Sequence, residues 1–180
     1  ELKPRGKVPV RRLVRRLKRD LSILNRIQEE LSEWSQGKAV LPPSVEWLLD
    51  NHYLAVREGE EALRALKKAG PLRGDGQGGA LLQRCVRGGV WAVPHLERER
   101  LTWYLKAFQT VQPLTERELS LLVPVLAIEL IQELAQEAGQ LEELRQGRTD
   151  PGRLEHLFSA LRALEGENWG PLLEEISRVE

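Results

Sequence analysis

The chain contains one cysteine, no methionine and few aromatic residues, and these shortages exclude several classes of protein. Because Cys85 is alone, neither a disulfide framework nor a cysteine-based metal cluster is expected. Aromatic residues make up only 5% of the 180 positions, and strand-forming residues are scarce, while Leu, Glu, Arg and Ala dominate. That mixture favours helices over strands and indicates an all-α fold.

The sequence also lacks an apolar run long enough to cross a membrane. Its most apolar stretch, residues 119–131, contains Ser120, Pro124 and Glu129 and falls short of the roughly 20 apolar residues that a span requires. The chain opens on Glu1 rather than Met and shows no signal-peptide pattern. The start on Glu1 and the lack of methionine indicate a piece of a longer protein or a processed product, and the single cysteine fits a reducing compartment.

Positive and negative charges are equal in number, 27 of each, but they are unevenly placed. Residues 1–19 hold nine cations: Lys3, Arg5, Lys7, Arg11, Arg12, Arg15, Arg16, Lys18 and Arg19. Residues 116–180 hold fourteen acids against six Arg, so the two ends can attract each other or recruit separate partners.

The basic end has three interpretations: contact with the inner leaflet of a membrane, contact with nucleic acid, or a solvated first helix after a flexible lead over residues 1–9. No aromatic residue is interleaved with the cations, and this argues against single-stranded nucleic acid. If the basic end makes a contact, we expect it to use Arg11, Arg12, Arg15 and Arg16.

Apolar residues at spacings of three and four predict a first helix over residues 10–36, with Gly37 as its C-terminal cap. A second helix is predicted over residues 44–69, and Gly59 on its apolar stripe indicates a close helix crossing. Because the link between the two helices is short, residues 10–69 should form an antiparallel hairpin.

Residues 70–94 are rich in glycine and predict an irregular linker between the hairpin and a helical bundle over residues 95–180. Within the linker we expect only a short helix over residues 80–87. The Gly-rich loop at residues 74–79 follows no predicted strand and lacks the Lys-Ser/Thr ending of a phosphate-binding loop, which indicates a plain linker.

In the bundle, Thr115 and Glu118 have the spacing of a capping box ahead of an apolar run. The helix that follows, over residues 116–138, is apolar nearly all round. It should be the central and most buried helix of this half, kinked near Pro124.

Further helices are predicted over residues 96–110 and after Asp150-Pro151, and Asn168 should cap a final helix that begins with Trp169. The five tryptophans fall mostly at helical spacing, which indicates core or helix-junction anchors. Sugar stacking is the alternative for three of them: Trp47, Trp103 and Trp169.

Residues 47–53, Trp-Leu-Leu-Asp-Asn-His-Tyr, place polar groups beside an apolar stripe, and each such group needs a partner if it is buried. The block either docks on something polar or builds a helix junction, with Asp50 and Asn51 expected to hold backbone. Glu46 and Asp50 near His52 could perform acid–base chemistry, but a polar helix face is the simpler interpretation. The histidines share no metal-ligand spacing, so we predict no metal, cofactor or catalytic residues.

Three blocks occur in a particular order along the chain. They are residues 41–53 with Trp-Leu-Leu-Asp-Asn, residues 111–119 with Pro-Leu-Thr-x-x-Glu-Leu, and residues 168–180 with Asn-Trp followed by Glu-Glu-Ile-Ser-Arg-Val-Glu. Together they resemble the N-terminal, membrane-proximal region of bacterial cyclic β-1,2-glucan synthases. The resemblance covers most of residues 15–180.

The resemblance implies a large inner-membrane glycosyltransferase that polymerises glucose from UDP-glucose and cyclises the product. None of its catalytic motifs lies in these residues, so this portion is expected to be a non-catalytic helical domain on the cytoplasmic side, with a docking or regulatory role. The candidate junction or docking residues are Trp47, Asp50, Asn51, His52, Thr115, Glu118 and Trp169. The expected partner is the remainder of the synthase, another protein or an anionic membrane surface. The alternative is a free-standing helical module that binds a protein or a membrane surface.

Overall fold

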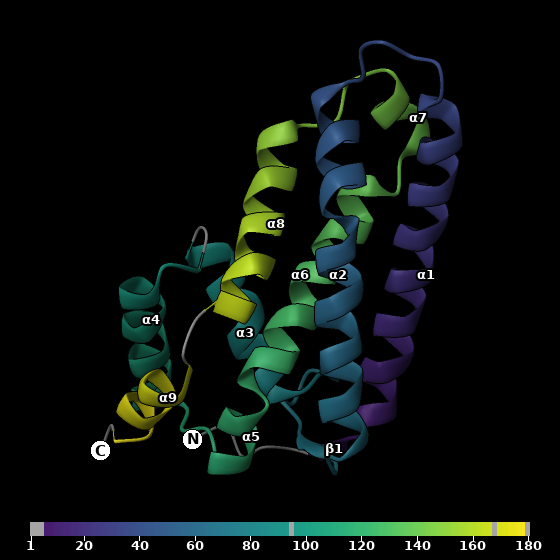
Figure 1. Cartoon of the computed structure of the whole chain (residues 1–180). Coiled ribbons are helices and arrows are strands. Elements are labelled where there is room, and N and C mark those ends of the chain that lie inside the picture. Colours follow the sequence, from purple (N-terminus) through teal and green to yellow (C-terminus); the bar gives the residue numbers. More distant parts are fainter. Residues whose placement is uncertain (1–5, 94–95, 167–168, 179–180) are drawn as a thin grey trace.

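The computed structural model describes residues 6–93, 96–166 and 169–178 of the chain. Over these residues it has nine helices and one sheet of two short strands, and 77% of the structure is helical. The predicted all-α fold is therefore confirmed. The long helices form a bundle, and two shorter ones, α4 and α9, lie together at its side (Figure 1).

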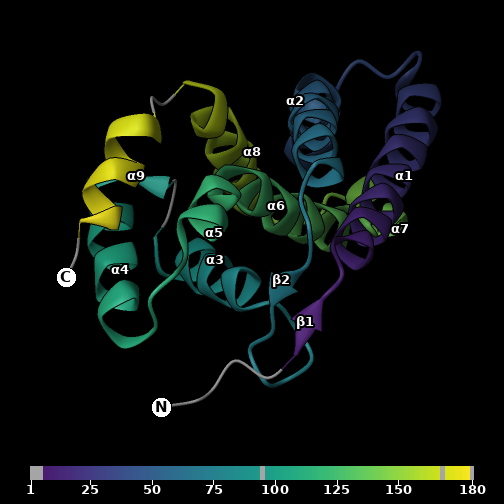
Figure 2. The ribbon, with the colours of Figure 1, turned by 90° about the horizontal axis from the view of Figure 1, so that it is seen from below.

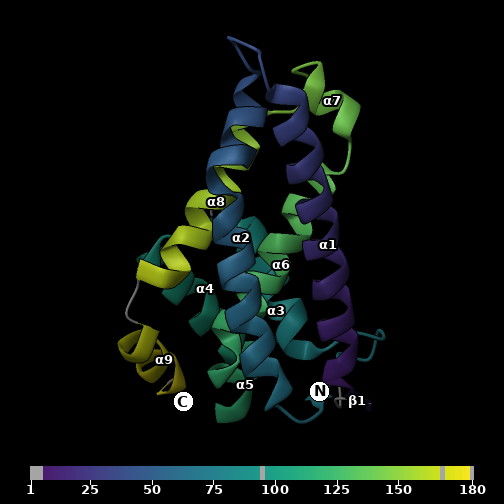
Figure 3. The ribbon, with the colours of Figure 1, turned by 45° about the vertical axis from the view of Figure 1, so that its right-hand side comes forward.

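The first two helices form the predicted antiparallel hairpin (Figure 3). Helix α1 spans Val10–Ser35 and helix α2 spans Pro43–Lys67. Gly37 has a φ of +76°, a left-handed conformation that suits the glycine expected after the helix end. Gly59 lies against Leu21 of α1, because a Cβ at Gly59 would be only 2.7 Å from a Leu21 methyl carbon. The predicted close crossing is confirmed.

Helix α6, Leu122–Ala138, is the centre of the bundle and packs against α1, α2, α3 and α8 (Figure 2). The predicted kink is a complete break, because a separate short helix α5, Glu116–Ser120, ends just before Leu121. Pro124 has no N–H to donate to the carbonyl four residues earlier, so it is tolerated only in the first turn of a new helix.

Helix α3, Leu81–Ala92, corrects the prediction of an irregular linker with only a short helix. Its Leu82, Cys85 and Val86 are buried, and it packs against α6 in the core. The glycines that suggested a break serve packing instead. A Cβ at Gly89 would lie 3.2 Å from the Tyr104 ring of α4, closer than side chains ordinarily approach.

The remaining elements are α4 (Arg98–Val111), α7 (Leu141–Arg145), α8 (Pro151–Gly166), α9 (Trp169–Ser177), β1 (Lys7–Val8) and β2 (Leu72–Arg73). Helix α8 packs against α2 and α6, and α9 packs against α4 and α5. The strands β1 and β2 are antiparallel. The hairpin and the C-terminal helices thus contribute to one continuous hydrophobic core.

None of the helices in the described ranges combines the length and the apolar character needed to cross a membrane.

Candidate functional site

The block at residues 47–53 lies on α2 and forms a helix junction. Asn51 is buried, donates to the carbonyl oxygen of Trp47 at 2.9 Å and accepts from Arg162 of α8 at 3.1 Å. Asp50 is exposed and, unlike Asn51, accepts no hydrogen bond from a described residue, so the expectation that it holds backbone is wrong. Successive residues of a helix point about 100° apart, so of the neighbours Asp50 and Asn51 it is Asn51 that faces α8.

His52 and Trp47 connect the same block to the rest of the hairpin. His52 Nε2 lies 2.7 Å from the side-chain oxygen of Asn25 in α1, and burial lowers the pKa of the imidazole. Trp47 is partly buried against the core. Glu46 and Asp50 are both exposed to solvent, which gives the possible acid–base pair no enclosed site in which to act.

The second block holds β2 against the start of α5. Thr115 Oγ1 accepts from the backbone N–H of Glu118 at 3.1 Å, and the backbone N–H of Thr115 donates to Glu118 Oε1 at 2.9 Å. The predicted capping box is confirmed. Glu118 is buried and also accepts from Arg73 Nε at 3.0 Å, and Arg73 donates to the carbonyl of Pro113 at 2.8 Å.

The third block joins the last two helices. The indole N–H of Trp169 donates to the carbonyl oxygen of Leu164 at the end of α8 at 3.0 Å. Asn168, the predicted cap, lies outside the described residues, as does His95. The three blocks therefore stabilise three separate junctions and do not form one site.

The tryptophans were predicted to be core or helix-junction anchors, and only some of them are. Trp169 is a junction residue, but Trp103 is 73% exposed and Trp91 is 62% exposed. Helix α4 packs against α3 and α9 and buries Leu101, Leu105 and Gln109, whereas Trp103 lies on its exposed face. Sequence spacing alone did not distinguish the two faces of this helix.

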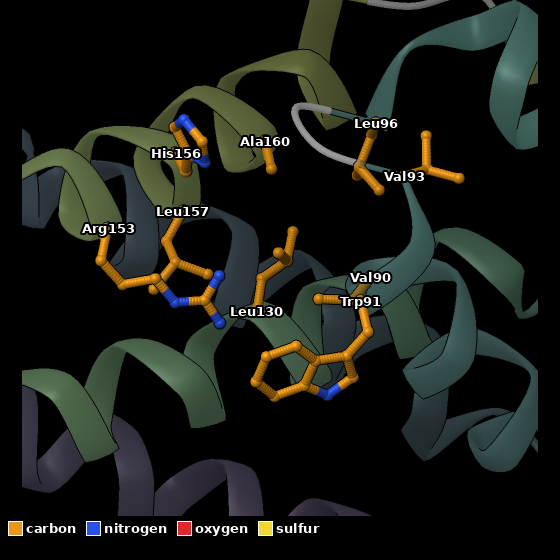
Figure 4. Close-up of a pocket in the computed structure, with 9 residues that line it drawn as sticks. All are labelled: Val90, Trp91, Val93, Leu96, Leu130, Arg153, His156, Leu157 and Ala160. Atoms are coloured by element: carbon orange, nitrogen blue, oxygen red, sulfur yellow. The ribbon is translucent and has the colours of Figure 1, made fainter.

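A pocket between α3, α6 and α8 contains the other exposed tryptophan (Figure 4). The guanidinium carbon of Arg153 lies 5.0 Å from the centre of the Trp91 ring, and Arg153 also pairs with Glu133 at 3.2 Å. Leu130 and Leu157 are buried beneath them. The polar rim of this pocket is engaged in holding α8 against α3 and α6.

Chemical reactivity is low at the one cysteine. Cys85 is buried, and burial raises the pKa of its thiol to about 12, so the thiol stays protonated near neutral pH and is a poor nucleophile. In the part of the chain that the structure describes, no group of three or more His, Cys, Asp or Glu side chains could hold a metal ion.

The four cations expected to form a basic contact divide into two sets. Arg11, Arg12 and Arg15 are exposed on the N-terminal half of α1. Arg16 instead points inward, where its Nη2 lies 3.0 Å from Oε1 of Glu129, a carboxylate only 2% exposed. Arg16 is therefore wrongly included in the exposed contact, because the Glu129 charge in α6 binds it.

Sequence reasoning missed the polar cluster around Glu129. Gln83 and Arg87 of α3 also bind this carboxylate, at 3.0 Å and 3.2 Å. The available signal was Glu129 itself, a charge within the most apolar stretch and near the middle of α6, because a buried charge requires partners.

A comparison of the chain with family models, curated proteins and solved structures finds no match.

Proposed function

We propose that the chain is a non-catalytic helical docking domain that contacts an anionic membrane surface through the N-terminal half of α1. The observation that supports this is the set of exposed cations there. Arg11, Arg12, Arg15 and Lys18 are exposed and make no ion pair with any acid in the described ranges. The acidic C-terminal half does not neutralise them, and its one ion pair with α1 among these residues goes to Arg16.

The hairpin concentrates further positive charge at the same end of the molecule. Because α1 and α2 are antiparallel, the exposed Lys67 and Lys68 at the end of α2 lie near the start of α1, where β1 carries the exposed Lys7 (Figure 1). Each Lys or Arg close to an anionic membrane contributes about 1 kcal/mol to binding. Several such cations favour a membrane surface, and the absence of aromatic residues among them disfavours single-stranded nucleic acid.

The second part of the proposal concerns the parent protein, a membrane-bound glucan synthase of the cyclic β-1,2 class. Support comes from the resemblance and from the position of its three blocks, which lie at junctions on α2, α5 and α9. The resemblance thus involves residues that hold helix junctions, and the domain would dock the catalytic remainder of such an enzyme at its membrane.

The docking test compares vesicle binding of two variants with that of the wild type. Reversing one stripe of α1, with Arg11→Glu, Arg15→Glu and Lys18→Glu, removes about 3 kcal/mol of attraction and adds repulsion, so binding to phosphatidylserine vesicles should weaken by at least about a hundredfold. The stripe is exposed, so circular dichroism and urea unfolding should be unchanged. Wild-type binding by this variant would overturn the docking proposal.

A matched variant controls for net charge. Arg26→Glu, Lys38→Glu and Arg148→Glu reverse three exposed cations outside the N-terminal half of α1 and should leave vesicle binding within a few-fold of wild type. The parent is tested by reading the coding sequence beyond Glu180. Membrane spans and a glycosyltransferase domain are expected there, and a stop codon near this position would refute the second part.

A further inference from the structure

A hollow lies between the N-terminal half of α1, the loop at residues 74–80 and α3. The loop lies beside β1, next to α3 (Figure 2). The hollow is lined by Arg16, Asp75, Gln77, Gly79, Gln83, Arg84 and Arg87. We call it the arginine hollow, after the guanidinium groups of Arg16, Arg84 and Arg87.

Two of its three guanidinium groups are held in place from below by Glu129. Arg16 Nη2 donates to Glu129 Oε1 at 3.0 Å, and Arg87 Nε donates to Glu129 Oε2 at 3.2 Å. A guanidinium has five N–H donors, so this bond leaves both terminal nitrogens of Arg87 available to a ligand. Groups that are already positioned lose little conformational entropy when a ligand binds.

The third guanidinium, that of Arg84, is exposed, and after the backbone N–H of Gln77 its charge helps to lower the pKa of Asp75. The side-chain amide of Gln77 adds neutral donors to the same hollow, whereas the buried Gln83 already donates one N–H to Glu129 at 3.0 Å. The loop is fixed by Asp75, whose Oδ1 accepts from the backbone N–H groups of Gln77 at 2.7 Å and Gly79 at 3.1 Å.

The local charge is positive. Three carboxylates lie in or next to the hollow: Asp20, Asp75 and Glu129. Four guanidinium groups oppose them: Arg16, Arg84 and Arg87 of the hollow, and Arg19, whose Nε lies 3.8 Å from Asp20. Arg84 and Arg87 are the exposed cations of the lining, and the most buried carboxylate, Glu129, is already paired with Arg16 and Arg87.

We propose that the arginine hollow binds a phosphate monoester group. Such a group carries close to two negative charges and three acceptor oxygens, and it matches the paired donors of arginine better than a carboxylate or a single-charge diester does. This proposal extends the docking function proposed above, and a membrane source for the phosphate rests on that function. The phosphate could belong to a lipid headgroup or to a soluble ligand, and the chemistry of recognition is the same.

Inorganic phosphate is the probe for the site itself. We expect it to shift the backbone amide resonances of Gln77, Gly79 and Gln83 saturably in the full chain at constant ionic strength. Arg84→Gln should raise the dissociation constant about tenfold, since it removes charge-assisted hydrogen bonds and leaves the Glu129 contacts intact. The exposed Arg26→Gln is the control and should leave the constant unchanged. Amide shifts that do not saturate with phosphate, or a dissociation constant that Arg84→Gln leaves unchanged, would overturn the proposal.

Vesicles then identify the source of the phosphate. Phosphatidic acid presents a monoester and phosphatidylserine a diester, and the two are compared at matched surface charge. If Arg84→Gln binds phosphatidic acid vesicles more weakly than wild type does, but binds phosphatidylserine vesicles equally well, the phosphate belongs to a lipid headgroup. If the two proteins bind each kind of vesicle equally well and inorganic phosphate still binds saturably, the phosphate belongs to a soluble ligand.

The two proposals fail in different ways. The variant with Arg11→Glu, Arg15→Glu and Lys18→Glu lies on the neighbouring stripe of α1 and should keep saturable phosphate binding. Loss of vesicle binding by this variant with phosphate binding retained supports both proposals. Unchanged vesicle binding with saturable phosphate binding overturns docking alone.

Discussion

Replacing Glu129 by glutamine should destabilise the protein strongly, because this carboxylate joins α1 and α3 to α6. It is 2% exposed and accepts from Arg16, Gln83 and Arg87 at 3.0, 3.0 and 3.2 Å. Removing one partner from a buried ion pair costs about 3–5 kcal/mol. The Arg87 side chain is 52% exposed and can return to water, so the lower end, about 3 kcal/mol, is expected.

Urea unfolding monitored by circular dichroism measures this loss directly. For a chain of this size, about 3 kcal/mol corresponds to a fall in Tm of about 6–12 °C. Glu155→Gln, an exposed substitution on α8, is the matched control and should change stability by less than about 0.5 kcal/mol.

A second substitution separates the network from a general packing effect. Arg87→Gln should cost clearly less in the Glu129→Gln background than in wild type, because its ionic partner has already been removed. A loss below about 1 kcal/mol for Glu129→Gln, the range of surface ion pairs, would refute the reasoning that this cluster holds the three helices together.

Three other predictions concern single residues. Thr115→Ala should lower stability by about 1 kcal/mol in urea unfolding through loss of the capping box, and an unchanged midpoint would contradict it. Cys85 should react with a thiol reagent at pH 8 only as fast as the protein opens, since burial raises its pKa to about 12; immediate labelling of the native chain would refute this. Burial raises the pKa of Asp20 above its ordinary value of 3.8, so the folded state binds its proton more tightly and stability falls as pH rises through that window. Asp20→Asn should therefore be more stable than wild type at pH 7, with no difference below about pH 3.8, and an equal gain at both pH values would show that the ionisation is irrelevant.

Local signals in the sequence predicted the hairpin and the capping box correctly. The apolar spacing of α1, the glycine at the α1–α2 crossing and the pair Thr115 and Glu118 each act through neighbours in sequence or through one helix face. Such patterns carry enough information because the physical cause lies within a few residues.

A short helix was expected over residues 80–87, but the extension of α3 to Ala92 and its burial in the core were missed, because they depend on distant contacts. Gly88 and Gly89 weaken a helix in isolation, but here they allow Tyr104 to pack closely, and the Tyr104 hydroxyl donates to the Cys85 carbonyl at 2.8 Å. The arginine hollow was missed for the same reason. Arg16, Arg84 and Arg87 come together only when α1 and α3 pack on α6.

Asp50 shows the limit of arguing from residue type. Its neighbour Asn51 bonds to Arg162, whereas Asp50 is exposed, and the rotation of one residue along the helix decides which of them faces α8. Without the position of α8, the sequence offered Asp50 and Asn51 as equal candidates for the buried polar residue of the junction.

The central claim is that exposed cations on α1 bind an anionic membrane. The most direct test is the ratio of vesicle partition coefficients between wild type and the variant with Arg11→Glu, Arg15→Glu and Lys18→Glu. On phosphatidylserine vesicles we predict a ratio of at least about one hundred at low salt, shrinking as salt screens the charges. A ratio near one at low salt would contradict the account.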